Sequence, residues 1–360
     1  MTEVAARLAR LRRLMAERGL AGMLLTTPPD VLWATGFLTR FWESPTRAWY
    51  VVVPAEGPTV AVIPEIGRAL MERCEVGEVR TWDSPGGDGV PLLDAALLEC
   101  GGPVGLPDGP ETHVRMPLAD LRRLSAPLVS DAGAMRAARI VKSAADIAGI
   151  EGACAVGTRA FARMPGMLDE GLGFDALFRR FQIAALEEGA DWIAYLAGGA
   201  GRLGYGDVIS SASPAPLREG DVVMLDTGIV VDGWFCDFDR NAVLGEPVPE
   251  VCAAAARLEG ATHAGFEAVR PGVRASDVWA AMNAVLDGPQ TGRLGHGLGL
   301  SLTEPPSLTP WDDTVLEAGM VLTLEPLAMT GPGTGLVHEE VIAVTEDGAR
   351  WITGPNAVLR

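Results

Sequence analysis

Three aspartates lie in or beside a predicted β-hairpin in the second half of the chain, where their spacing suits a bound cation. The pair Asp232-Gly233, a strong signal for a two-residue turn, separates two apolar runs. With this turn, Asp226 faces Asp239 across the hairpin, and strand alternation puts Asp237 on the same face. Three like charges on one half-buried face would repel and would be costly to desolvate, unless a divalent cation is present. A solvated hairpin face is the alternative, and the apolar residues of both runs disfavour it.

A faint internal repeat adds two more acids to this set. Residues 217–226 and 316–325 both read Leu-x-x-Gly-x-Val-apolar-x-Leu-carboxylate, ending in Asp226 and Glu325. Any turn followed by a buried strand would share the apolar part of the pattern, but such a strand should avoid an acid. Glu339 precedes another apolar run, 341–344, and repeats the arrangement of the first hairpin. Four of these five acids, Asp226 and Asp237 on one hairpin and Glu325 and Glu339 on the other, indicate a shared cation site.

One histidine has the surroundings of a metal ligand. His296 lies in the segment Gly295-His296-Gly297-Leu298-Gly299. Histidine is the usual nitrogen ligand for borderline metals, and glycines let the backbone approach a site closely. A lone histidine is more often structural, so the prediction that His296 binds a metal depends on the acids described above.

The elements that must position these residues fall into two predicted domains. Residues 1–132 alternate helical and strand patterns, which indicates a mixed α/β domain. A break follows at Asp131-Ala132-Gly133, and Ser143 with Asp146 then forms a weak capping box that starts a helix. The second domain, residues 139–360, holds both copies of the repeat. The predicted fold class is therefore α/β (α+β).

Composition excludes several classes of function. The formal net charge of -18 argues against nucleic-acid binding and otherwise indicates solubility. No run of about 18 apolar residues predicts a membrane span, and the N-terminus lacks the apolar core of a signal peptide. The five cysteines are scattered, without a Cys-x-x-Cys pair. They are typical of buried thiols in a reducing compartment, so we expect a cytoplasmic protein.

In their order, these motifs resemble those of the prolidase, aminopeptidase P and methionine aminopeptidase family. The matching pieces are Asp226-Thr227-Gly228, Gly233-Trp234-Phe235-Cys236-Asp237, the His296 segment, Glu325-Pro326 and Glu339. The resemblance implies the pita-bread fold, a pseudo-twofold α/β arrangement, for the second domain. The first domain is similar to the creatinase/prolidase N-terminal domain, including residues 33–37. The likeness thus extends over essentially the whole chain, and it implies a homodimer.

The resemblance also implies a role for each ligand. Asp226 holds one metal ion, His296 and Glu325 hold a second, and Asp237 and Glu339 bridge the two. Four carboxylates balance the charge of two divalent ions, and an oxygen-rich set with one imidazole suits Mn, Co, Fe or Zn. The expected substrate is a dipeptide or another small molecule.

Two histidines that the peptidases use to position the scissile amide are missing here. Thr303 occupies the place of one, and residues 192–225 contain no histidine where the other is expected. Tyr195, Tyr205 and Asp207 are the polar or aromatic candidates in that stretch, and Tyr205 is a possible substrate contact. Threonine can donate a hydrogen bond but cannot act as an imidazolium, so a catalytic role for Thr303 would be limited.

Two further departures concern residues next to the ligands. Asp239 and Arg240 stand where the family often has Thr-Arg, and we predict a salt bridge between them behind the ligands, in preference to a ligand role for Asp239. His338 precedes Glu339. Neighbouring strand residues point to opposite faces, so His338 is predicted to be structural, with a substrate contact as the alternative.

Three functions follow from this pattern. The first is an Xaa-Pro dipeptidase-like or aminopeptidase-like hydrolase, in which metal-activated hydroxide attacks an amide and Glu325 shuttles the proton. The second is a non-peptidase relative acting on a small organic molecule, as creatinase and a sulfonium-compound lyase do on this fold. The missing histidines favour the second. A binding protein without catalysis is disfavoured, because a binder has little need for all five ligands.

Overall fold

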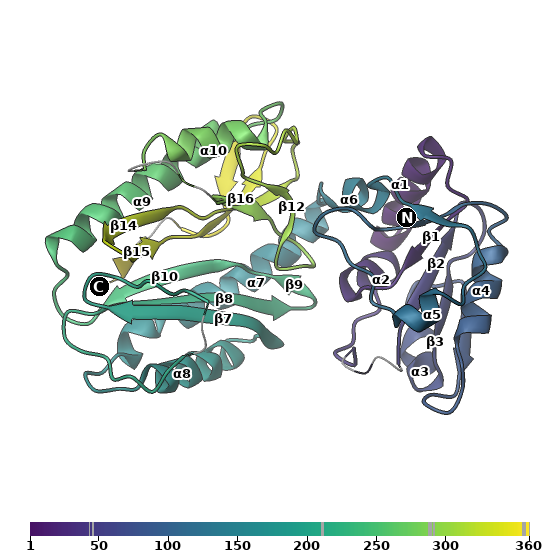
Figure 1. Cartoon of the computed structure of the whole chain (residues 1–360), viewed down its shortest axis with the longest axis horizontal. Coiled ribbons are helices and arrows are strands. Elements are labelled where there is room, and N and C mark those ends of the chain that lie inside the picture. The colour runs from purple at the N-terminus through teal and green to yellow at the C-terminus, as the bar shows by residue number, and fades with distance from the viewer. Residues whose placement is uncertain are drawn as a thin grey trace. The chain divides into compact units, whose positions relative to one another are not determined.

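The computed structural model describes residues 1–42, 44, 47–209, 212–286, 290, 292–354 and 358–359. They form two compact units, Met1–Arg139 and Ile140–Arg360 (Figure 1). Residues 133–138, which the sequence pattern left between the domains, belong mostly to helix α6 of the first unit. Within the described residues, none of the helices combines the length and apolar character that crossing a membrane requires.

The first unit is built on a six-stranded sheet with the order β4-β3-β2-β1-β5-β6. Its strands are β1 Gly22–Leu25, β2 Tyr50–Pro54, β3 Val60–Pro64, β4 Glu78–Trp82, β5 Val104–Leu106 and β6 Leu128–Ser130. Its helices are α1 Glu3–Glu17, α2 Pro28–Thr35, η1 Glu65–Gly67, α3 Arg68–Met71, α4 Val90–Leu98, α5 Leu118–Leu121 and α6 Ala134–Arg139. The mixed α/β character of this unit agrees with the sequence pattern. Leu24, Val52 and Val62 are fully buried and pack with Leu93 of α4 in its core.

The second unit carries four α-helices, one short 3-10 helix and twelve strands among its described residues. Its helical segments are α7 Ala144–Ala162, η2 Met164–Met167, α8 Phe174–Glu187, α9 Pro249–Ala268 and α10 Ala275–Asn283. Its strands are β7 Trp192–Gly201, β8 Val222–Val231, β9 Trp234–Phe235, β10 Phe238–Val243, β11 His296–Gly297, β12 Glu304–Ser307, β13 Val321–Leu324, β14 Leu327–Gly331, β15 Thr334–Val337, β16 Glu340–Val344, β17 Ala349–Trp351 and β18 Val358–Leu359. The capping box predicted at Ser143 and Asp146 is present at the start of α7.

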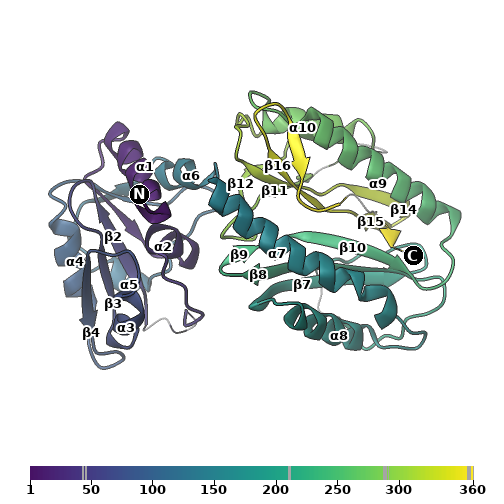
Figure 2. The same ribbon diagram turned by 180° about the vertical axis from the view of Figure 1, so that it is seen from behind.

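The internal repeat corresponds to two similar halves, each with two helices followed by antiparallel strands. The first half contains the sheet β18-β10-β8-β7, and the second contains the sheet β12-β11-β13-β16-β17 with the pair β14-β15. Helices α7 and α8 contact β8 and β7, whereas α9 contacts β13, β14 and β15. The two helix pairs therefore lie on the outer sides of the strands (Figure 2).

Strand β8 contributes alternate side chains to two buried clusters, as a strand between two helix layers must. Val223 and Leu225 pack in the cluster under α7 and α8, and Met224 packs in the cluster under α9 and α10. Asp226 shares the parity of Met224 and therefore points toward the second half. In β13, Val321 packs in the α7–α8 cluster. Position 325 is four residues further on, so it lies on the same face as Val321 and points toward the first half. Because side chains alternate along β8 and β13, the acids of the two halves point toward each other.

Candidate metal centre

The predicted turn fixes the register of the first hairpin. Asp232 and Gly233 both have positive φ values, 50° and 84°, as a type I′ turn requires. The register then pairs Asp226 of β8 with Asp239 of β10, as predicted from the turn. The second half repeats this geometry, because the β13–β16 ladder ends at the pair Leu324–Glu340 and Glu325 and Glu339 come directly after it. Each of the five predicted ligands lies in a strand or directly next to one: Asp226 in β8, Asp237 before β10, His296 in β11, Glu325 after β13 and Glu339 before β16.

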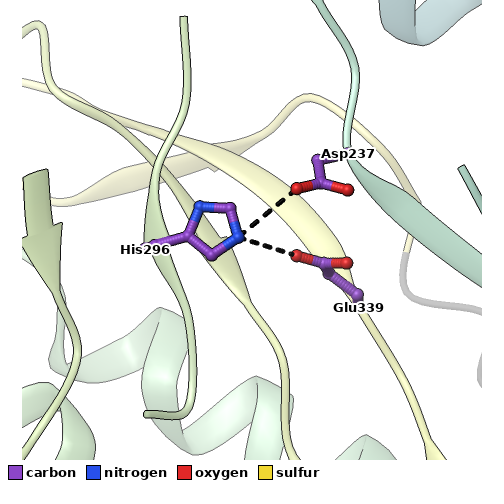
Figure 3. A group of neighbouring side chains, drawn as sticks. All are labelled: Asp237, His296 and Glu339. Carbon is purple, nitrogen blue, oxygen red and sulfur yellow. Dashed lines mark ion pairs between the residues drawn. The ribbon is translucent and has the colours of Figure 1, made fainter. Parts of the chain in front are cut away.

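Three of these residues form a tight buried cluster (Figure 3). The Nε2 atom of His296 lies 3.3 Å from Oδ2 of Asp237 and 3.7 Å from Oε1 of Glu339. One ligand atom from each residue falls within 4.8 Å of the other two. The Nδ1 atom of His296 lies 2.9 Å from the carbonyl oxygen of Gly297. Nδ1–H therefore donates to that carbonyl, which leaves the Nε2 lone pair facing the carboxylates, as in a metal-ligating histidine.

Among the described residues, Asp226 and Glu325 lie outside this cluster of three, but their charges raise the pKa of Glu339 within it, and both keep some exposed surface. Burial raises the pKa of Asp226 and of Glu339 well above the usual range, and the charge of Asp237 raises both further. Burial raises the pKa of Glu325 to about 7, against the opposing effect of His296 and with a further rise from Asp226. These carboxyls therefore cannot all ionise together unless a cation compensates them.

A divalent ion fits this donor set. Oδ1 of Asp226 and Oε1 of Glu339 are buried and have no hydrogen-bond partner among the described residues. Buried acceptors are almost always satisfied, so two such carboxylate oxygens, one of them 3.7 Å from the Nε2 atom of His296, favour a bound cation. The set of carboxylates and one imidazole is chemically suited to a catalytic divalent metal ion.

The acid cluster predicts an unusual pH dependence for the metal-free protein. The pKa values of Glu325 and Asp239 are raised to about 7 and about 8, so the folded state binds more protons than the unfolded state up to about pH 8. The free energy of unfolding therefore falls as pH rises through this window. His338, whose pKa burial lowers to about 4, acts in the opposite sense below about pH 6.5.

We expect the Tm of metal-free protein to fall between about pH 6.5 and about pH 8 at constant ionic strength. Saturating metal should weaken or reverse this slope, because metal and protons compete for the same carboxylates. Thermal melts with and without metal at both pH values measure the effect. A metal-free Tm that stays flat or rises over this window would contradict the crowding of acids.

Tyr195 and Tyr205, the two tyrosines of the stretch where the peptidases have a histidine, differ in burial and in hydrogen-bond partners. Tyr195 of β7 is half-buried, and its phenol hydrogen-bonds the Asp226 carboxylate. Tyr205 is buried, its hydroxyl donating to Oδ1 of Asn241 at 2.9 Å and accepting the Val337 N–H at 2.8 Å. This burial contradicts the substrate contact considered for Tyr205, whose phenol instead ties β10 to β15. Tyr195 is the tyrosine at the site.

Thr303 lies just before β12 and is partly exposed, close to an arginine that the sequence patterns did not single out. Nη2 of Arg293 is 3.5 Å from Oγ1 of Thr303. Burial raises the pKa of Asp237 and of Glu325, and the positive charge of Arg293 opposes that rise in both, so Arg293 acts electrostatically on both halves of the site. The only sequence signal for Arg293 is its place three residues before His296.

A second layer of buried charge lies behind the ligands. Oδ1 of Asp239 accepts the backbone N–H of Glu339 at 3.1 Å, and burial raises the pKa of Asp239 to about 8. Nη2 of Arg240 lies 3.1 Å from Oε2 of Glu340. The predicted salt bridge between Asp239 and Arg240 is therefore wrong. Neighbouring strand residues point to opposite faces, and the Arg240 guanidinium contacts Asp239 at its backbone carbonyl rather than at its carboxylate.

His338 belongs to this buried layer. Its Nδ1 is 3.5 Å from Oδ1 of Asp239 and its Nε2 is 3.4 Å from Oε1 of Glu340. Burial lowers the pKa of His338 to about 4, so the ring is neutral near pH 7. The side chain is buried, which favours the structural role predicted for His338 over a substrate contact.

Comparison with known proteins identifies the family. Residues 148–346 match the model of metallopeptidase family M24, and residues 7–134 match that of the creatinase/prolidase N-terminal domain. The chain belongs to metallopeptidase family M24. This M24 protein is thus a hydrolase of a class that uses divalent metals, and the pita-bread fold with a creatinase-like N-terminal domain is confirmed.

Two of the similar proteins match nearly the whole chain, and a third matches 60% of it. This M24 enzyme is 33% identical over 359 residues to "Probable dipeptidase PepE" of Mycobacterium tuberculosis, covering 96% of this chain and 93% of the relative. It is 28% identical over 232 residues to the Xaa-Pro dipeptidase of Pyrococcus furiosus, covering 60% and 63% of the two chains. The crystal structure of dipeptidase PepE from Mycobacterium ulcerans superposes with a TM-score of 0.85 at 28% identity, covering 99% and 98%. These likenesses support a metal-dependent peptidase.

Proposed function

We propose that this enzyme is a dipeptidase that works with two divalent ions held by Asp226, Asp237, His296, Glu325 and Glu339. The observation that carries the proposal is the cluster of three ligand atoms within 4.8 Å of one another, in which the buried Oε1 of Glu339 has no hydrogen-bond partner among the described residues. When bound, two divalent ions supply an activated water near neutral pH and polarise a carbonyl. The oxygen-rich donors favour Mn, Co, Fe or Zn.

The residues of the chain have separate tasks in this reaction. Glu325 has a pKa of about 7 and some exposed surface, so it is suited to take a proton from water and return it to the leaving amine. The hydrogen bond from Nδ1–H to Gly297 holds the His296 ring in one orientation. Asp239 holds the backbone of Glu339 and so fixes that ligand from behind.

The two functions left open by the sequence now carry unequal support. Relatives named as a dipeptidase and an Xaa-Pro dipeptidase favour dipeptide hydrolysis. Thr303 in place of the peptidase histidine still favours a relative that handles a small organic molecule other than an Xaa-Pro peptide. We further propose a homodimer and, because all five cysteines are free, a reducing compartment such as the cytoplasm.

The test is an assay of metal-stripped protein reconstituted with manganese or with cobalt. Xaa-Pro and ordinary dipeptides should be hydrolysed only after metal is restored, and creatine and a sulfonium compound should not be consumed. Metal-dependent turnover of creatine or the sulfonium compound, with no turnover of any dipeptide, would overturn the proposal in favour of the non-peptidase function.

Thr303→His should increase the rate of Xaa-Pro dipeptide hydrolysis. The substitution restores a donor that can stabilise developing charge, and one such donor contributes about 10²–10³ in rate. The increase should appear in kcat, and metal content should stay unchanged because Thr303 is not among the proposed ligands. Thr303→Val is the matched control that restores no donor.

A wild-type turnover of about 10 per second on Xaa-Pro dipeptides is typical of enzymes. It would contradict the prediction that Thr303 in place of the histidine limits the rate. In that case another group already supplies the donor, and Tyr195 beside Asp226 is the candidate.

A further inference from the structure

The first unit contains a cavity that the proposed reaction does not use. It has a volume of about 260 Å³ and lies where strands β2 and β4 meet the start of α4 and the short helix α5 (Figure 1). Its lining includes the aromatic side chains of Tyr50 and Trp82 and the charged side chains of Asp88, Asp120 and Arg123. The volume is somewhat below that of a site for a drug-sized ligand, so it suits a molecule of a few heavy atoms.

Tyr50 and Trp82 form an aromatic wall on one side of this cavity. Tyr50 of β2 pairs with Val62 of β3, and Val62 pairs with Arg80 of β4. Trp82 follows Arg80 by two residues, so its side chain lies on the same face of the sheet as that of Tyr50. The two rings are nearly parallel, with an interplanar angle of 19° and centroids 6.5 Å apart. Such a wall attracts cations and packs well against alkyl groups.

The hydroxyl of Tyr50 is a polar group without a partner on a side chain that is otherwise enclosed. Tyr50 is 2% exposed, and its hydroxyl forms no hydrogen bond with any residue that the structure describes. Burial raises the pKa of the phenol, and the charge of Asp120 raises it further, so Asp120 lies within electrostatic range of the hydroxyl. The phenol is therefore neutral near pH 7. Because buried polar groups nearly always have a partner, the hydroxyl favours a polar ligand in the cavity.

The charged residues of the described lining leave a surplus of negative charge. They are two carboxylates, Asp88 and Asp120, and one guanidinium, Arg123. Nη1 of Arg123 lies 3.3 Å from Oδ1 of Asp88 but 3.8 Å from Oδ1 of Asp120, and Nη2 also contacts Asp88. Oδ1 of Asp88 accepts the N–H of Val90 at 3.0 Å as well, so Asp88 caps the start of α4. Arg123 and this helix end are thus engaged mainly by Asp88, and the charge of Asp120 remains for a ligand.

We propose that this cavity binds a small primary ammonium ion. The N–H groups of the ammonium donate to the Asp120 carboxylate and to Oη of Tyr50, and the alkyl part of the ligand packs against the Trp82 ring. The site lies wholly in the first unit, so the proposal does not depend on the dipeptidase function. An anion held by Arg123 at the start of α4 is the competing occupant.

Calorimetric titrations of metal-loaded protein with butylammonium, butanol and butanoate test the charge preference. The three probes are similar in size and differ in charge. Butylammonium should bind at least about tenfold more tightly than butanol, as expected for a charge-assisted hydrogen bond, and butanoate should bind more weakly than either. Binding of butylammonium no tighter than that of butanol would overturn the proposal. Tightest binding of butanoate would also overturn it and would assign the cavity to anions.

Three variants assign the binding to this cavity. Asp120→Asn should weaken butylammonium binding about tenfold, and Tyr50→Phe should weaken it about threefold to tenfold. The control is Glu56→Gln, which neutralises an exposed acid of the same unit outside the cavity and should bind as wild type does. Equal affinity in wild type, Asp120→Asn and Tyr50→Phe would place the probe elsewhere, such as at the acid cluster, and would overturn the proposal.

Thermal melts without the probe test the unpartnered hydroxyl itself. Tyr50→Phe should keep the Tm of wild type, because the hydroxyl that it removes has no partner among the described residues. A clearly lower Tm would show that the hydroxyl is bonded within the protein, and the proposal would then lose its acceptor.

Discussion

Asp237→Ala is expected to lower metal-dependent activity by more than about 10³-fold, because it removes a carboxylate that faces both His296 and the acids of the second half. The same change should destabilise metal-free protein far less than metal-loaded protein. Without metal, Asp237 is one of several buried acids that repel one another, so its loss relieves repulsion. With metal, its loss removes the proposed bridging ligand and the stabilisation that binding provides.

The measurement is a pair of thermal melts for wild type and variant, with and without saturating metal. Asp237→Asn keeps the shape and removes the charge, and it should reproduce the pattern. Asp347→Ala, which truncates an exposed aspartate of the same unit, is the control for the substitution itself. Equal losses of Tm in the two states would contradict the bridging role of Asp237.

Arg240→Met is expected to lower the free energy of unfolding by about 3–5 kcal/mol, the cost typical of breaking a buried ion pair from one side. The side chains of Arg240 and Glu340 are 6% and 0% exposed, so the variant leaves the Glu340 carboxylate buried without its cation. The double variant Arg240→Met with Glu340→Gln should recover much of the loss, because it removes the unpaired charge as well.

Denaturant unfolding of the metal-free proteins measures both changes. The matched control is Arg274→Met, which breaks the exposed pair between Arg274 and Asp313 and should cost less than about 1 kcal/mol. A loss in Arg240→Met no greater than that in Arg274→Met would show that the layer behind the ligands contributes nothing to stability.

Turn preferences and strand alternation were enough to predict the first hairpin and the face on which its acids lie. A two-residue Asp-Gly turn determines the register of the strands that it joins, so the pairing of Asp226 with Asp239 followed from sequence spacing alone. The second half was predictable from the first, because the repeat puts Glu325 after one buried apolar run as it puts Asp226 after the other. The resemblance of the ordered motifs to a family supplied the fold.

Contacts between distant segments were beyond these rules. The partner of Arg240 is Glu340, which belongs to the other sheet, and no local pattern predicts a contact between β10 and β16. Tyr205 was a candidate for the substrate site because it is polar and near the first acid in sequence, but its hydroxyl is buried against β15. Arg293 lies in a segment without periodicity, and only the fold brings its charge to the acids.

The count and position of bound metal ions test the central claim most directly. Protein stripped of metal and reconstituted with manganese should contain two ions per chain. A crystal structure of that protein should place them about 3.5–4 Å apart, held by Asp226, Asp237, His296, Glu325 and Glu339. A single fully occupied ion, or ions held by other residues, would contradict the account.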